Sequence, residues 1–433
     1  MFYDIIITGD KMEYRKIKGH AYNLHLINTD KFKKNIIKIN FRGKLVKEDI
    51  VKRKLITSTL LDSNSIYNSK RLLDIRTEEL YNLSGYNETY ITGNSLVTSL
   101  TATFLNDKYC NESIFEECTK FQADLLLKPL ITNNKFNHKA YERAVKLIIE
   151  DIKSIKEDPK VYANNRILEE MDNGIFSYRD TGYLEDLEDI NEKNLYEYYL
   201  DMIKTDKIDI FVIGNIHEYN IEKMIRDNYD FNTIKKMKIS PFIYHTRFRK
   251  RYRKVVEEFD TVQSTLKVGY KIEKMTSFEY QYVLPIYNYI LGGGPDSKLF
   301  RNVREKNSLC YSISSSARMI SNALIITSFI DKGNFNKAFK LIKKEFEDMD
   351  NGNFDEEDID KAKAIYLNVY KEIEDSEASI LGQFIAHEYY DTDLYKEKAK
   401  NIMKVDKKMI LKLAHKIHPD TVYLLEGVKN EEE

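Results

Sequence analysis

The stretch from Gly292 to Ser312 reads GGGPDSKLFRNVREKNSLCYS and carries residue types that are common in active sites. Three glycines open it, a short amphipathic helical turn follows, and Arg304 and Tyr311 then stand seven residues apart. Guanidinium and phenol groups both donate hydrogen bonds. The stretch therefore looks like part of an active site, and the rest of the chain must indicate which chemistry it serves.

The glycine run, Gly292-Gly293-Gly294, does not fit a nucleotide site. No Gly-Lys-Ser/Thr follows it, and it comes after a predicted helix rather than a strand, so the phosphate-loop and dinucleotide patterns both fail. The sequence also has no Gly-x-Ser-x-Gly nucleophile elbow. Two interpretations stay open: a helix C-cap with a tight turn, or a position where a peptide backbone needs room.

The histidines do not form a zinc motif. A helical zinc peptidase site needs two His on one helical face and a carboxylate base. None of the eight His residues belongs to a His-x-x-Glu-His, its inverse or a His-x-x-x-His pattern. His415 and His418 are predicted to lie in a helix that ends before Pro419, and no Glu or Cys motif accompanies them. We interpret them as structural residues.

The composition excludes several classes of protein. The chain has 433 residues, of which 42% are hydrophobic and 32% charged, with a net charge of −1, so it predicts large cores but no field that attracts nucleic acid. No apolar run approaches the roughly 20 residues that span a bilayer, and the N-terminus lacks a signal-peptide pattern. Three scattered cysteines fit a reducing compartment. We expect a cytoplasmic protein, with Cys310 as a buried strand residue.

Two halves of the chain predict similar sets of elements. In the first half, apolar periodicity predicts strands at 24–29, 35–43 and 207–215 and a hairpin at 88–105. It predicts helices at 47–61, 113–127, 137–155, 159–172 and 192–203, and a further helix that Ser69 caps. In the second half it predicts strands at 261–272 and 421–428, a strand pair at 310–330, and helices at 278–291, 336–349, 356–374 and onward to His418.

The similarity of the halves indicates a duplication. The segment that begins at Phe136 matches the one that begins at Phe354, and IFVIGNI near the end of the first half matches VYLLEGV near the end of the second. The expected fold is α+β, with two duplicated domains, each a mainly antiparallel or mixed sheet covered by helices on one face. The alternative is that two α+β domains share a coarse pattern by chance.

The predicted domains are residues 1–228 and 255–433, joined by a basic linker at 229–254. Aromatic residues are interleaved with nine basic residues there, as in some nucleic-acid-binding segments. The alternative is a solvated linker whose charge is partly offset by the acidic EEFD that follows. The nine basic residues are Lys235, Lys236, Lys238, Arg247, Arg249, Lys250, Arg251, Arg253 and Lys254.

The motif resembles the second-domain signature of the pitrilysin/insulinase-type metallopeptidases, or inverzincins, which include the mitochondrial processing peptidase and bacterial relatives. The matching residues are Gly292–Gly294, Lys298-Leu299-Phe300, Val303-Arg304-Glu305-Lys306, Leu309, Tyr311 and Ser312. The resemblance implies two LuxS/metallohydrolase-like domains over the whole chain.

The resemblance also implies roles for the motif. In that family the Arg and the Tyr reach across to the zinc site and contact the substrate, which here means Arg304 and Tyr311. Arg offers a rigid fork of donors to a peptide carbonyl, and the Tyr hydroxyl can donate to an oxyanion. Gly292, Gly293 and Gly294 would bind substrate beside them. The alternatives are a surface salt bridge for Arg304 and a partly buried strand residue for Tyr311.

The first domain departs from the family pattern. The family's His-x-x-Glu-His falls on Lys54-Leu-Ile-Thr57-Ser58, so both His ligands and the Glu base are missing. The remaining ligand, a Glu on a later helix, falls near Glu150-Asp151, and one carboxylate cannot hold zinc alone. We expect no metal in this chain and no peptidase activity of the chain by itself.

Some members of the resembled family are heterodimers in which one subunit binds zinc and the other supplies the Arg/Tyr pair. The resemblance therefore predicts a non-catalytic subunit, with zinc and His-x-x-Glu-His in a homologous partner, and a peptide as substrate. Neither nucleic acid nor membrane is an expected partner. Two rivals remain: a structural homologue without a role in proteolysis, including a homodimer, and a nucleic-acid binder that uses Arg247–Lys254.

Overall fold

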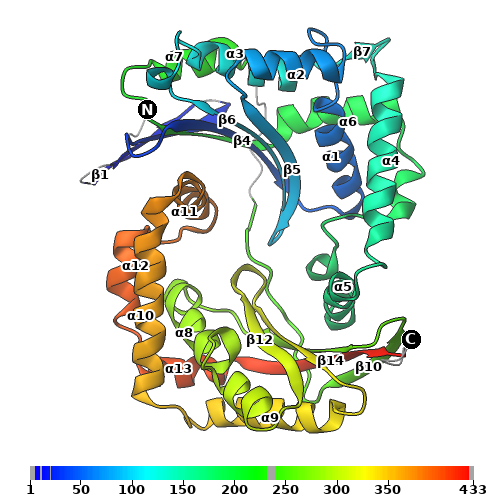
Figure 1. Cartoon of the computed structure of the whole chain (residues 1–433), viewed down its shortest axis with the longest axis vertical. Helices are drawn as coiled ribbons and strands as arrows, with labels where there is room; N and C mark the ends of the chain where they lie inside the picture. Colours follow the sequence, from blue (N-terminus) through cyan, green and yellow to red (C-terminus); the bar gives the residue numbers. More distant parts are fainter. Residues whose placement is uncertain (1–4, 10–11, 20, 232–238, 429–433) are drawn as a thin grey trace. The chain divides into compact units, whose positions relative to one another are not determined.

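The computed structural model describes residues 5–9, 12–19, 21–231 and 239–428 (Figure 1). The chain forms two compact units. The first contains residues 1–153 and 179–240, and the second contains residues 154–178 and 241–433. No helix of the described residues is long and apolar enough to cross a membrane.

The first unit is built on a seven-stranded sheet with the order β1-β2-β3-β9-β4-β6-β5. Neighbouring strands are antiparallel except β3 and β9, which are parallel. The strands are β1 (Ile5–Gly9), β2 (Met12–Lys18), β3 (Tyr22–Asn28), β4 (Lys34–Lys44), β5 (Ser84–Thr92), β6 (Ser95–Leu105) and β9 (Lys207–Gly214); a separate hairpin pairs β7 (Ile131–Thr132) with β8 (Lys135–Phe136).

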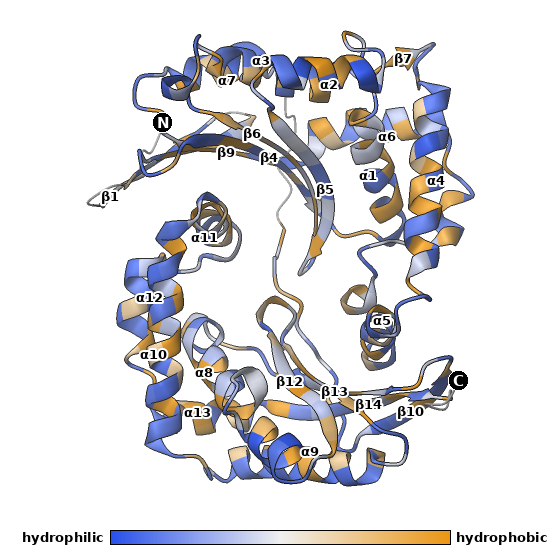
Figure 2. Cartoon of the chain, viewed as in Figure 1, coloured by the Kyte–Doolittle hydropathy of each residue, from blue (hydrophilic) through white to orange (hydrophobic). Residues whose placement is uncertain are grey.

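Helices cover this sheet through a continuous apolar core. Ile37 and Ile39 of β4 pack in one cluster with Leu55 of α1, and the buried residues of α4 recur every four positions, so one face of that helix is apolar (Figure 2). Ser69 caps α2 by accepting a hydrogen bond from the main-chain N of Leu72, as predicted. The helices are α1 (Lys47–Leu60), α2 (Lys70–Glu79), α3 (Phe115–Leu127), α4 (His138–Ser154), α6 (Glu192–Thr205) and α7 (Ile221–Asn228).

The second unit repeats the strand order of the first. Its sheet runs β10-β14-β11-β13-β12, and β10 is parallel to β14 as β3 is to β9, while the other pairs are antiparallel. The expected α+β fold and its duplication are therefore confirmed by topology. The strands are β10 (Arg253–Phe259), β11 (Ser264–Ile272), β12 (Cys310–Arg318), β13 (Ala323–Ile330) and β14 (Ile417–Gly427).

Helices lie on both faces of the second sheet, not on one face as predicted, because α5 packs on the face opposite to α9 (Figure 1). On one face Tyr270 of β11 stacks on Phe346 of α9, with ring centroids 3.7 Å apart. On the other face Ile167 of α5 packs with Tyr423 and Leu425 of β14. The helices of this unit are α5 (Pro159–Met171), α8 (Leu284–Asn288), α9 (Phe335–Asp350), α10 (Glu356–Glu372), α11 (Glu377–Tyr390), α12 (Tyr395–Ile402) and α13 (Lys407–Ala414).

Helix α5 belongs to the second unit, although the sequence places it within residues 1–228. Glu257 of β10 accepts hydrogen bonds from Arg166 Nε of α5 at 2.9 Å and from the Tyr423 hydroxyl of β14 at 2.9 Å. Gly269 of β11 has no side chain, and Met171 at the end of α5 occupies the space that a Cβ there would need. These contacts join residues far apart in the sequence, so periodicity alone could not place the helix.

The predicted linker is divided by the structure. Lys235, Lys236 and Lys238 lie outside the described residues. Residues 241–249 run without regular secondary structure in the second unit, and β10 begins at Arg253, so the end of the predicted linker is a strand.

The last strand begins earlier than predicted. His418 and Pro419 lie in β14, not in a helix, because α13 ends at Ala414. The register between β11 and β14 shifts between Gly269 and Tyr270, and this irregularity accommodates Pro419, which has no N–H to donate. His418 Nε2 lies 2.7 Å from Glu273 Oε1, which agrees with a structural role. Strands β1 and β2 were not predicted either.

Candidate functional site

Arg304 lies in a π-helical segment, Phe300–Glu305. Its side chain is exposed, and its guanidinium carbon lies 4.7 Å from the centre of the Phe300 ring. Within the described ranges, its guanidinium forms no hydrogen bond or ion pair, so the alternative of a surface salt bridge is not seen there. A stacked guanidinium keeps its N–H groups available for another acceptor.

Tyr311 lies at a bulge in β12, which is the edge strand of the second sheet. Cys310 pairs with Ile330 and Ser312 with Phe329, so Tyr311 has no opposite residue. Its side chain is 60% exposed, which contradicts the alternative of a partly buried strand residue. Bulges at sheet edges redirect side chains and are frequent beside active sites.

The backbone that leads to these residues is irregular in three places. Residues Glu279–Val283, Tyr289–Gly293 and Phe300–Glu305 are π-helical, so the predicted helix at 278–291 is α-helical only over Leu284–Asn288. The wide turns flank Pro285, whose ring conflicts with ordinary α-helical turns. π-helical turns are rare and occur often at functional sites. Pro285 was the sequence signal that could have indicated this irregularity.

The glycines are required by close packing within this unit. A Cβ on Gly292 would lie 2.7 Å from Leu299 Cδ1 and 3.0 Å from the main-chain N of Ser315 in β12. A Cβ on Gly294 would lie 2.7 Å from the Tyr289 ring. Gly292 and Gly294 are buried, whereas Gly293 is exposed. A Cβ on Gly293 would lie 2.7 Å from Asn288 Nδ2 and 3.1 Å from the main-chain oxygen of Asn288, so packing accounts for all three glycines, although Gly293 is the one open to solvent.

The positions that the resemblance assigns to zinc ligands hold an ion pair instead. Lys54 Nζ of α1 lies 3.6 Å from Asp151 Oδ2 of α4. Thr57 is buried, and its hydroxyl donates to the main-chain oxygen of Lys54 at 2.9 Å. An ammonium group repels a metal cation, and neither a His nor a Cys replaces the missing ligands. The residues present at these positions do not fit zinc.

Cys310 beside Tyr311 is not an activated nucleophile. The thiol is buried in β12, as predicted. Burial raises the pKa of the Cys310 thiol against the opposing effects of Ser328 and Arg304. A thiol with a raised pKa is mostly protonated at neutral pH and reacts slowly.

Comparisons with known proteins agree with these features. The sequence family described as "Peptidase M16 inactive domain" matches residues 189–366, which contain the glycines, Arg304 and Tyr311. A protein of Bacillus subtilis (strain 168) named "Probable inactive metalloprotease YmfF" is 28% identical over 428 residues, which cover 96% of this chain and 98% of the relative.

Two solved structures have a similar fold. A conserved protein from Enterococcus faecalis V583 has a TM-score of 0.88 and 26% identity, and the match covers 95% of this chain and 98% of that chain. A peptidase M16 inactive domain from Pseudomonas fluorescens has a TM-score of 0.74 and 15% identity, and the match covers 97% of this chain and 100% of that chain. The second likeness concerns the fold alone.

Proposed function

Since this chain is an inactive member of the insulinase-type (M16) metallopeptidase family, we propose that it is the non-catalytic subunit of a heterodimeric zinc peptidase. The observation that carries the proposal is a contrast between its two units. The first has a Lys54–Asp151 ion pair where the family binds zinc, whereas the second presents Arg304 and Tyr311, whose polar groups have no hydrogen-bond or ion-pair partner within its described residues. A chain that had lost every role in proteolysis would not need this exposed pair.

Each residue of the pair has a distinct role in the proposed complex. Arg304 binds a carbonyl of the peptide through its planar set of N–H groups and so fixes the register of the substrate. The Tyr311 hydroxyl donates a hydrogen bond to the oxyanion that forms at the scissile carbonyl. The exposed Gly293 lies where the peptide would pass beside them, Gly292 lets the turn approach β12, and Gly294 lets it approach the Tyr289 ring.

The homologous partner contributes the rest of the site. It carries His-x-x-Glu-His, and zinc bound there supplies an activated water and polarises the carbonyl. The peptide lies extended and pairs with a sheet edge of the partner by strand addition.

The experiment titrates this chain into a purified homologue that carries His-x-x-Glu-His, from the same genome, with zinc and a fluorogenic peptide library. We expect cleavage to rise with added chain and to saturate at one chain per partner. If the partner cleaves equally well alone, the chain is a structural homologue and the proposal is wrong.

A further inference from the structure

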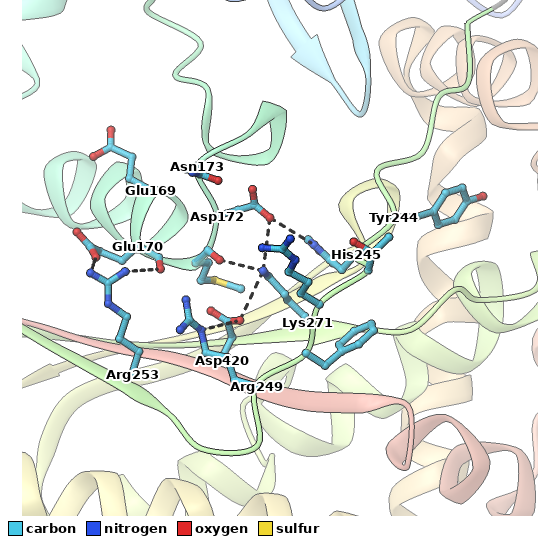
Figure 3. A pocket seen from close by; sticks show the side chains of 14 residues that line it. Glu169, Glu170, Asp172, Asn173, Tyr244, His245, Arg249, Arg253, Lys271 and Asp420 are labelled. Atoms are coloured by element: carbon cyan, nitrogen blue, oxygen red, sulfur yellow. Dashed lines mark hydrogen bonds and ion pairs between the residues drawn. The ribbon is translucent and has the colours of Figure 1, made fainter.

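A cavity of about 730 Å³ lies in the second unit, between the end of α5 and the segment that leads to β10 (Figure 3). Charged side chains from the end of α5, from residues 245–249 and from the three strands β10, β11 and β14 line it. Those that matter here are Glu169, Glu170, Asp172, His245, Arg247, Arg249, Arg253, Lys271 and Asp420.

The floor of the cavity is a buried group of paired charges. Lys271 is 7% exposed, and its Nζ donates to the main-chain oxygen of Met171 at 2.9 Å. The same ammonium lies 3.4 Å from Asp172 Oδ2 and 3.5 Å from Asp420 Oδ2, as Figure 3 shows. Burial lowers the pKa of His245, and the Lys271 ammonium lowers it further, so this imidazole is neutral near pH 7. Lys271 thus offsets one of the two floor carboxylates, and Arg249, whose Nε lies 3.3 Å from Asp420 Oδ2, offsets the other.

The carboxylates that α5 contributes to the cavity, Glu169 and Glu170, are paired with cations as well. Arg253 Nη2 lies 2.7 Å from Glu170 Oε2, and Arg166 lies 2.7 Å from Glu169 and 2.6 Å from Glu170. The carboxylates of the cavity therefore all have cationic neighbours.

Two guanidinium groups that line the cavity have N–H groups without a hydrogen-bond acceptor among the described residues. Every residue from 244 to 249 lines the cavity, and this brings Arg247 and Arg249 to it together with His245. Arg249 bonds to Asp420 only through Nε, at 3.3 Å, and so retains its terminal N–H groups. Arg247 forms no ion pair with any described residue. The arrangement is a candidate anion-binding site above a floor of paired charges.

The main chain of the same segment also lacks partners. From residue 244 to residue 249 the backbone forms no hydrogen bond within the described part of the chain, and it has no regular secondary structure. Main-chain N–H and C=O groups without partners are what an extended peptide pairs with in strand addition. Nucleic acid fits less well, because its backbone needs a series of cations along its path, whereas two guanidinium groups at this cavity have open donors.

We propose that this cavity binds a carboxylate of an extended peptide, with Arg247 and Arg249 as the carboxylate-binding residues and the 244–249 backbone as the pairing strip. The inference rests on the proposed function, and it adds a substrate class: peptides with an acidic side chain or a free C-terminus that reaches this site. Arg binds carboxylates through paired N–H donors, which gives both strength and orientation.

The test measures binding of fluorescein-labelled Ala/Ser decapeptides to the whole chain by fluorescence anisotropy. One peptide has a central Glu and an amidated C-terminus, one has Gln and an amidated C-terminus, and one has Gln and a free C-terminal carboxylate. We expect at least one carboxylate peptide to bind about tenfold tighter than the Gln amide. Arg247→Gln, which breaks no ion pair, should remove most of this preference, and adding Arg249→Gln should remove it entirely.

The matched control is Arg251→Gln, since Arg251 is exposed in the same basic segment but does not line the cavity. It should keep the preference. The proposal is overturned by equal binding of all three peptides, or by an equal loss in the control. Tighter binding of single-stranded oligothymidine, lost in Arg247→Gln, or competition by inorganic phosphate without any peptide preference, also overturns it.

This assay is independent of cleavage. If the preference is absent while the reconstituted peptidase is active, the cavity proposal fails and the proposed function stands. If the preference is present while the added chain never stimulates a partner, the cavity binds the peptide but the proposed function fails.

Discussion

Arg304 and Tyr311 are held in place by irregular backbone rather than by bonds of their own polar groups to described residues. A π-helical turn presents the first, and a bulge in an edge strand presents the second. Motif spacing was enough to identify both residues from the sequence. The turn and the bulge were not predicted, because both are exceptions to the regular periodicity from which elements are inferred.

Arg304→Ala should raise KM about tenfold or more in the reconstituted peptidase, because a charge-assisted bond to the bound peptide is lost. The effect on kcat should be smaller, since Arg304 binds the peptide in the ground state as well. Steady-state kinetics with Lys306→Ala as the control measure this, as Lys306 is an exposed cation only two residues further along. An unchanged KM would contradict the role given to Arg304.

Lys267 is a residue whose burial the sequence did not reveal. It is 5% exposed in β11, and its Nζ donates to Thr327 Oγ1 at 3.1 Å. Burial, followed by the charge of Arg318, lowers its pKa to about 8. The charged form is therefore destabilising in the folded state at neutral pH.

Lys267→Met should raise the free energy of unfolding of the second unit at pH 7, by up to roughly 3 kcal/mol. The unfolded state binds more protons between pH 8 and the unfolded pKa of 10.5, so wild-type stability should rise over that window and the variant should lack this rise. Urea unfolding of both proteins at pH 7, 9 and 10.5 measures the free energy of unfolding over this window. The exposed Lys250→Met is the control, and identical pH profiles for the two variants would be inconsistent with a buried charge.

At the scale of elements, α5 is the segment that sequence periodicity assigns to the wrong neighbours. Its length and capping were predictable, because Asp158 caps it and Pro159 begins it. Its position depends on Arg166, Glu257 and the space left by Gly269, and these contacts are not local in the sequence. The same reason explains why β10 was not predicted and its first two residues were assigned to the linker: its partner, β14, lies at the far end of the chain.

Glu257→Ala should loosen α5 from the sheet. The carboxylate accepts bonds from Arg166, Tyr162 and Tyr423, so its loss should lower the stability of the second unit by about 2 kcal/mol. Hydrogen exchange of the α5 amides should quicken more than that of α9. The adjacent, exposed Glu258→Ala should leave both rates unchanged, and equal exchange in the two variants would disprove this anchoring.

At the scale of the whole molecule, duplication is the feature that the sequence indicated best. The two sheets share the order of five strands and the position of one parallel pair. The divergence between the units is chemical: the first has lost the donors for zinc, and the second has kept an exposed Arg/Tyr pair. Composition could not reveal this chemical difference between the two units. It became visible when the sequence was compared with the family motif residue by residue.

The purified chain should contain far less than one zinc per molecule. Lys54 and Asp151 neutralise each other where the family places its metal, and a single carboxylate is a poor site. Elemental analysis after dialysis measures the content, with the zinc-bearing partner as the positive control. A stoichiometric metal that survives dialysis would contradict the account of the first unit.

The most direct test of the central claim is the single-turnover cleavage rate of the zinc-bearing partner when saturated with either the wild-type chain or Tyr311→Phe. The substitution removes only a hydroxyl from a side chain that is 60% exposed, so folding and assembly should be unaffected. We predict that the rate falls by about 10²–10³ while the affinity between the subunits stays the same. Equal rates with the two chains would contradict the claim that this subunit completes the active site of its partner.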